Sequence, residues 1–110
     1  MAYENMRLLL FFDLPTITEK DRKIYTYFRK YLIRNGYIMI QYSVYGKIFN
    51  NRDAARNHIK ILYKNVPAKG YIRIMLVTEK QYNKSIIIIG GKSNQEEVLT
   101  INPFVIIWKG

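Results

Sequence analysis

A single acidic residue, Asp13, stands where a long apolar run of the sequence ends. Five apolar residues precede it and a Leu-Pro turn follows, in the stretch RLLLFFDLP at residues 7–15. An apolar run bounded by a turn signal predicts a strand buried on both faces, with Asp13 at its solvent end. Asp13 is therefore our candidate metal ligand and catalytic residue; the alternative is an acid that caps the turn by accepting backbone N–H bonds.

The residue types available in the chain restrict the metal ion. There is no cysteine and one histidine, His58, which excludes disulfides and thiol chemistry and argues against structural zinc. Oxygen ligands favour Mg²⁺, or else Mn²⁺. One carboxylate is a sparse ligand set, but a two-fold axis near the end of the first strand would bring two Asp13 side chains together. We interpret His58, at the edge of an apolar stripe, as a packing residue.

The charge of the chain indicates the partner. Against 8 Asp and Glu there are 18 Lys and Arg, a formal net charge of +10 in 110 residues. This predicts attraction to a polyanion, and nucleic acid is favoured over an anionic membrane because the expected basic helix turns its apolar side to the core. Seven candidate nucleic-acid-binding residues lie on two expected helices: Arg22, Lys23, Arg29, Lys30, Arg34, Arg56 and Lys60. A solvated helix face is the alternative.

The expected elements follow from periodicity and punctuation. The first are a strand over 6–13, a helix capped by Thr18 that runs to about Asn35 and is ended by Gly36, and a strand pair within 37–49 broken near 41–43. A helix over about 52–65, capped by Asn50 or Asn51, and a strand over 70–80 follow. The buried stripes are expected to be Ile24, Tyr27, Phe28, Tyr31 and Leu32, and then Ala55, Ile59, Leu62, Tyr63 and Val66. This βαββαβ order predicts an α+β fold, a ferredoxin-like sandwich forming one domain over residues 1–110.

Two further apolar segments, 85–91 and 100–108, predict extra C-terminal strands. Exposed apolar strands would template aggregation, so we expect residues 85–110 to pack against a sheet edge, within the chain or across a homodimer. No apolar run approaches the roughly 20 residues of a membrane helix, and the first residues lack a signal-peptide pattern. A cytoplasmic protein without a membrane partner is therefore expected.

The order and spacing of several short motifs resemble those of a known protein family. Asp13 to Pro15 after the apolar strand, Arg22, Leu32, Gly36, and then Gln41, Ser43, Val44 and Tyr45 are similar to the small CRISPR-associated protein of spacer acquisition, the second core Cas protein. The resemblance covers about residues 6–90 and looks most like members from type II systems. Tyr45 is a mild departure, because the family often has Phe there.

This resemblance implies a ferredoxin-like homodimer that exchanges C-terminal strands and acts as a metal-dependent nuclease on RNA or double-stranded DNA. It further implies that the dimer bridges subunits of the CRISPR integrase and supports duplex DNA before its insertion, and Asp13 matches the family's metal-associated acid. Two alternatives stay open. One is a stand-alone, toxin-like endoribonuclease, and the other is a structural module that binds nucleic acid and never cuts it.

Overall fold

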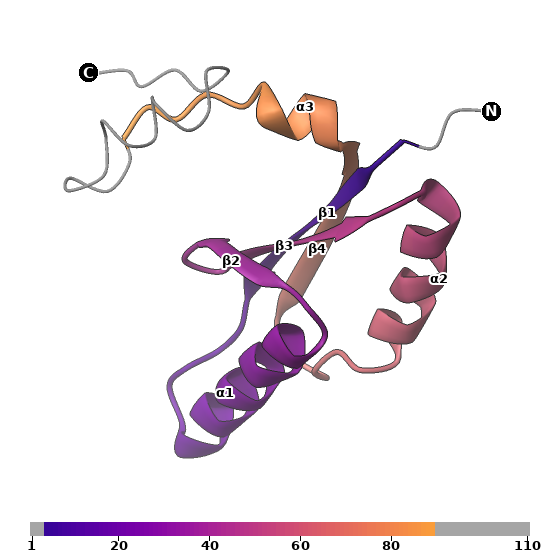
Figure 1. The fold of residues 1–110 in the computed structure, drawn as a ribbon. Helices are drawn as coiled ribbons and strands as arrows, with labels where there is room; N and C mark the ends of the chain where they lie inside the picture. The colour runs from indigo at the N-terminus through magenta and orange to yellow at the C-terminus, as the bar shows by residue number, and fades with distance from the viewer. Residues whose placement is uncertain (1–3, 90–110) are drawn as a thin grey trace.

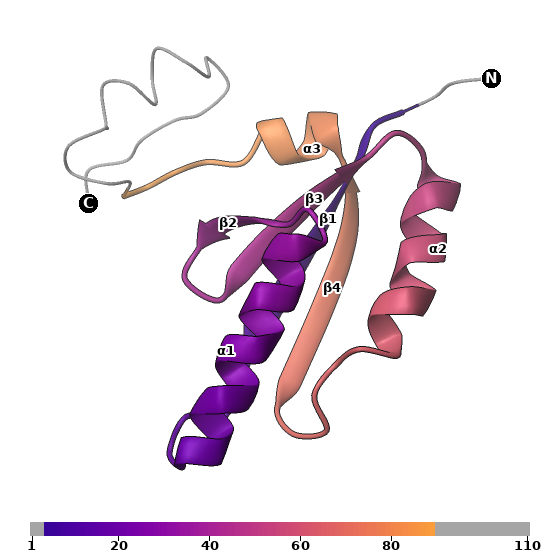
Figure 2. The ribbon, with the colours of Figure 1, turned by 60° about the horizontal axis from the view of Figure 1, so that its bottom comes forward.

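The computed structural model describes residues 4–89, which form one antiparallel sheet with two long helices packed on it (Figure 1). The elements are β1 (Met6–Asp13), α1 (Glu19–Arg34), β2 (Ile38–Gln41), β3 (Val44–Phe49), α2 (Arg52–Tyr63), β4 (Tyr71–Thr78) and α3 (Glu79–Asn83). The strand order β2-β3-β1-β4, with α1 and α2 packed on the same face of the sheet, is the predicted ferredoxin-like arrangement (Figure 2).

The helices begin and end where short polar residues and glycine predict. Thr18 is the N-cap of α1 in a reciprocal capping box, in which the Asp21 N–H donates to Thr18 Oγ1 at 3.0 Å. Gly36 follows the helix with φ +85°, the left-handed conformation that glycine adopts without strain. Asn51 caps α2 by accepting from the Ala54 N–H at 2.8 Å. The predicted limits of both helices are confirmed.

The core lies between the helices and one face of the sheet, which we call the covered face. Alternate residues of β1 point into it, and Leu8 and Leu10 are 0% exposed. They pack with residues of both helices and of β3, in a cluster of Leu8, Leu10, Phe12, Leu14, Phe28, Leu32, Tyr37, Tyr45 and Leu62.

The opposite side of the sheet is the open face, because no element among residues 4–89 covers it fully. The strand register assigns it these residues: Arg7, Leu9, Phe11 and Asp13 of β1, Val44, Gly46 and Ile48 of β3, and Tyr71, Arg73, Met75 and Val77 of β4. Those of β1 are half-buried, except that Asp13 is exposed. Within residues 4–89, β1 is thus fully buried on one face only, and the prediction that it is buried on both faces stays a prediction.

Two tyrosines that we placed in the buried stripes lie outside. Tyr27 is 71% exposed and Tyr63 81% exposed, and Ile24 is also at the surface. On α1 the place is taken by Tyr25, whose ring meets Phe12 edge to face at 5.5 Å. Tyrosine suits either environment, so hydrophobic spacing could not decide which ring turns inward.

The chain leaves the sheet earlier than predicted. Strand β4 ends at Thr78, which caps the short helix α3 by accepting from the Gln81 N–H at 3.0 Å. Glu79 thereby reaches back to Arg7 in a two-bond ion pair at 2.6 and 3.0 Å. Of the expected strand over 85–91, residues 85–89 form no regular strand, and the rest of it and the segment 100–108 lie outside the described residues.

Candidate metal site and nucleic-acid interface

Asp13 is the last residue of β1 and lies on the open face, opposite Tyr71 of β4. Its side chain is exposed in a depression that Ser43, Tyr71 and Arg73 also line. Among residues 4–89, no ion pair or side-chain hydrogen bond engages its carboxylate. The turn-capping alternative therefore has no support in these contacts, and the carboxylate is available to an external ligand.

Two tight turns hold the strand end that carries Asp13. Ser43 has a left-handed backbone with φ +63°, and its carbonyl accepts a hydrogen bond from the Phe12 N–H at 3.1 Å. Gly70 has φ +100°, and a β-carbon there would come within 2.8 Å of the Asp13 carbonyl oxygen. Because both turns pack against the backbone next to Asp13, the carboxylate stands on a fixed support.

The donor set at this position is small. Within the described part of the chain, no cluster of three or more histidine, cysteine or acidic side chains could hold a metal ion. An exposed carboxylate without a cationic partner is a suitable hard ligand for Mg²⁺, but the remaining positions would have to be filled by water, by substrate phosphate or by a second copy of Asp13. Among residues 4–89, Asp13 would thus supply one carboxylate ligand to such an ion.

Arg73 is a component of this depression that the sequence did not identify as functional. It lies opposite Phe11 in the β1–β4 register, so it shares the open face with Asp13, and it forms no ion pair with an acid among residues 4–89. A guanidinium group binds phosphate through paired hydrogen bonds. The signal was present in the sequence, because Arg73 is the only charged residue within an otherwise apolar strand.

The predicted cations of α1 divide into engaged and available groups. Arg22 donates to the backbone carbonyls of Thr16 and Ile17, at 3.2 and 2.8 Å, and so holds the turn before the helix. Arg29 donates to the Tyr45 hydroxyl at 3.1 Å. Lys23 forms an exposed pair with Glu19 at 3.7 Å, which contributes little energy.

The remaining predicted cations are exposed, namely Lys30, Arg34, Arg56 and Lys60. One hollow on α1 brings together Arg22, Lys23 and Lys30, with Glu19, Thr26 and Tyr27 as its other members. Arg29 and Arg34 on α1, and Arg56 and Lys60 on α2, do not line this hollow. The structure thus supports a compact basic surface on α1 and a separate basic area on α2.

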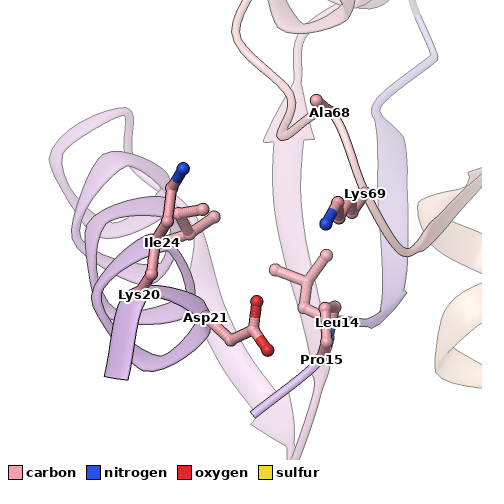
Figure 3. A pocket seen from close by; sticks show the side chains of 7 residues that line it. All are labelled: Leu14, Pro15, Lys20, Asp21, Ile24, Ala68 and Lys69. Atoms are coloured by element: carbon pink, nitrogen blue, oxygen red, sulfur yellow. The ribbon is translucent and has the colours of Figure 1, made fainter. Parts of the chain in front are cut away.

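A cavity of about 160 Å³ lies between the start of α1 and the chain before β4 (Figure 3). Lys20, Asp21 and Ile24 line it from α1, and Leu14 and Lys69 lie across from them. Hydrogen bonds from the Thr18 backbone and side chain lower the pKa of Asp21, whose carboxylate is therefore engaged in capping the helix. The cavity is mainly apolar and does not include Asp13.

His58 of α2 is half-buried and contacts the residue before β2 and the last residue of β3. Its Nε2 lies 2.8 Å from the Tyr37 hydroxyl, and its ring packs 5.2 Å from that of Phe49. Burial, and then the nearby charge of Lys47, lowers the pKa of His58 below its ordinary value of 6.5. The interpretation of His58 as a packing residue is confirmed, and nothing places it near Asp13's depression.

No helix among the described residues is long and apolar enough to cross a membrane. The fold and the exposed residues define a small, basic, ferredoxin-like protein with a single acid at the end of its central strand. The family model of CRISPR associated protein Cas2 matches residues 6–85, and the chain belongs to this family, as its resemblance predicted.

Relatives in three bacteria extend this finding, and each is named CRISPR-associated endoribonuclease Cas2. The protein of Acidovorax ebreus strain TPSY is 47% identical over 92 residues, which cover 84% of this chain and 90% of the relative. The protein of Treponema denticola is 45% identical over 102 residues, which cover 93% of this chain and 100% of the relative. The protein of Campylobacter jejuni is 40% identical over 101 residues, which cover 87% of this chain and 71% of the relative.

Proposed function

We propose that this protein binds nucleic acid in CRISPR adaptation and cleaves phosphodiester bonds with Mg²⁺ held by Asp13. The observation that carries the proposal is the position of Asp13, an exposed carboxylate without an ion pair among residues 4–89, on a strand end held by two turns and beside Arg73. The name endoribonuclease, given to the relatives, supports RNA as a substrate. Double-stranded DNA is the second substrate to test.

In this proposal the two charged residues of the depression, Asp13 and Arg73, have defined tasks. Asp13 holds the metal ion, joined by Asp13 of a second copy across a two-fold axis, and Arg73 binds the phosphate next to the bond that is cut. When bound, Mg²⁺ lowers the pKa of a coordinated water and neutralises charge that develops on the phosphate. The cations of α1 and α2 hold the strand backbone, which makes binding tolerant of sequence.

Cleavage of RNA and duplex DNA by purified Asp13→Asn protein tests the catalytic half. We expect a loss of at least about 100-fold in Mg²⁺, because the charge that holds the ion is removed while the side-chain shape is kept. Asp53→Asn is the matched control, since Asp53 is an exposed acid in the first turn of α2. Equal rates in wild type and Asp13→Asn would remove Asp13 from the mechanism and favour the non-catalytic module.

The binding half is tested separately by the salt dependence of duplex affinity. Each phosphate that a lysine or arginine neutralises contributes roughly 0.9 to the slope of log affinity against log salt. We expect a steep slope that decreases in Lys30→Gln and Lys60→Gln proteins. An affinity that does not respond to salt would contradict the proposed interface.

We further propose that a homodimer bridges subunits of the CRISPR integrase. The half-exposed apolar residues of the open face support dimerisation, because an apolar sheet face is stable only when another surface covers it. Co-purification with an integrase encoded beside this gene distinguishes this role from a stand-alone nuclease, which would cut RNA without binding the integrase. The expected assignment to type II systems and the cytoplasmic location stay predictions.

A further inference from the structure

Tyr27 is an exposed aromatic residue that the proposed function leaves without a task. Its ring was expected in the core, yet 71% of the residue is exposed, on the middle of α1. It lines the basic hollow together with Arg22, Lys23 and Lys30. On its other side it lines a second hollow, which Phe28 and Val66 also line. Tyr27 therefore lies between two depressions of the surface and lines both of them.

The spacing along α1 places cations on both sides of this ring. Lys23 precedes Tyr27 by four residues and Lys30 follows it by three, so the three side chains are neighbours on one helix face. Lys30 forms no ion pair among residues 4–89, and the exposed pair of Lys23 with Glu19 at 3.7 Å is weak enough to open. An accessible aromatic ring thus stands between two available ammonium groups.

This combination is suited to a nucleic-acid strand whose bases are unpaired. An unpaired base can stack on an aromatic ring while lysines contact the flanking phosphates, whereas a duplex keeps the faces of its bases inside the helix. We propose that Tyr27 is a stacking site for an unpaired base of single-stranded RNA or DNA, or of a frayed duplex end. The inference rests on the proposed function and assigns one residue, Tyr27, to contact with an unpaired base.

The test compares the affinity for a single strand with the affinity for a fully base-paired duplex without overhangs. Both are measured by fluorescence anisotropy in one buffer. Tyr27→Ala is expected to weaken single-strand binding about tenfold, in RNA and in DNA, and to change duplex binding less than twofold. Tyr27→Phe is expected to retain the wild-type affinity, because it keeps the ring. Tyr63→Ala is the matched control, since Tyr63 is 81% exposed on α2 and lines neither hollow of Tyr27.

Three results would overturn the inference: unchanged single-strand affinity in Tyr27→Ala, an equal loss for strand and duplex, or the same loss in Tyr63→Ala. Thermal melting followed by circular dichroism checks that each variant is folded, as expected for residues at the surface. If Tyr27→Ala has no effect while duplex binding stays steeply dependent on salt, only the stacking site is excluded. If the wild-type protein binds neither strand nor duplex, the proposed function itself is contradicted.

Discussion

The two faces of the sheet are built from the same strands but differ in burial. On the covered face, Leu8 and Leu10 of β1 are completely buried by the protein's own helices. On the open face, Leu9 and Phe11 of the same strand are only half-buried, and Met75 of β4 is 52% exposed. The covered face accounts for the fold of one chain, whereas the open face carries Asp13 and is suited to a second surface.

This contrast shows that an unbroken apolar run has two meanings. Alternation of polar and apolar residues indicates a strand with one solvent-exposed face. Because β1 lacks this alternation, the sequence predicted that both of its faces are buried. Within residues 4–89 the two long helices cover one face only, so full burial of the second face would need material from outside these residues. The chemistry and the assembly of the protein are therefore expected on the same side of the sheet.

The largest effect is expected from shortening a side chain on the covered face. Leu10→Ala should reduce the free energy of unfolding by about 2–5 kcal/mol, because it leaves a cavity in a closely packed core. Leu9→Ala, one residue away on the open face, should cost clearly less at low protein concentration. Urea denaturation of both variants measures the difference, and similar losses would show that the two faces are equally buried in the single chain.

A charge on the open face should act on assembly. Met75→Glu is expected to weaken dimerisation at least tenfold, about 1.4 kcal/mol, because two copies would bury uncompensated carboxylates. Analytical ultracentrifugation over a range of concentrations measures this change. Ile61→Glu on the exposed side of α2 is the control, since Ile61 is 56% exposed. Wild-type-like association of Met75→Glu would place the dimer contact elsewhere.

The smallest effect is expected from pH, because the protonation of His58 changes the free energy of unfolding only slightly. Its pKa is lowered in the folded state, so the unfolded chain takes up the proton first as the pH falls below about 6.5. Its contribution to stability is therefore complete above that pH and is lost as the pH falls through the folded pKa. Urea denaturation at pH 7.5 and 5.5 should show a larger decrease for wild type than for His58→Gln.

The elements were predictable from local chemistry, but the use of their surfaces was not. Thr18, Gly36 and Asn51 mark helix ends because caps and left-handed turns depend on neighbouring residues alone. Tyr27 was misplaced because tyrosine satisfies both a core and a surface. The end of β4 was missed because α3 depends on the contact of Glu79 with Arg7, 72 residues away in sequence.

At the candidate site, the sequence identified Asp13 but not what surrounds it. Its position after an apolar run is a local signal, and the structure places it at the end of β1 as expected. Arg73 becomes its neighbour only through the pairing of β1 with β4, which no local pattern specifies. The basic residues were predicted to bind nucleic acid from two helices, but hydrogen bonds to Ile17 and Tyr45 engage Arg22 and Arg29.

The central place of β1 also affects how the chain folds as it is synthesised. Of the described strands β1 is synthesised first, yet its two neighbours are β3 and β4, and β4 begins only at Tyr71. Until β4 emerges, one backbone edge of the apolar segment MRLLLFFD lacks its native partner, and such edges favour aggregation. The strand that supports Asp13 can therefore pair with β3 early, but it completes its pairing only after β4 has been synthesised.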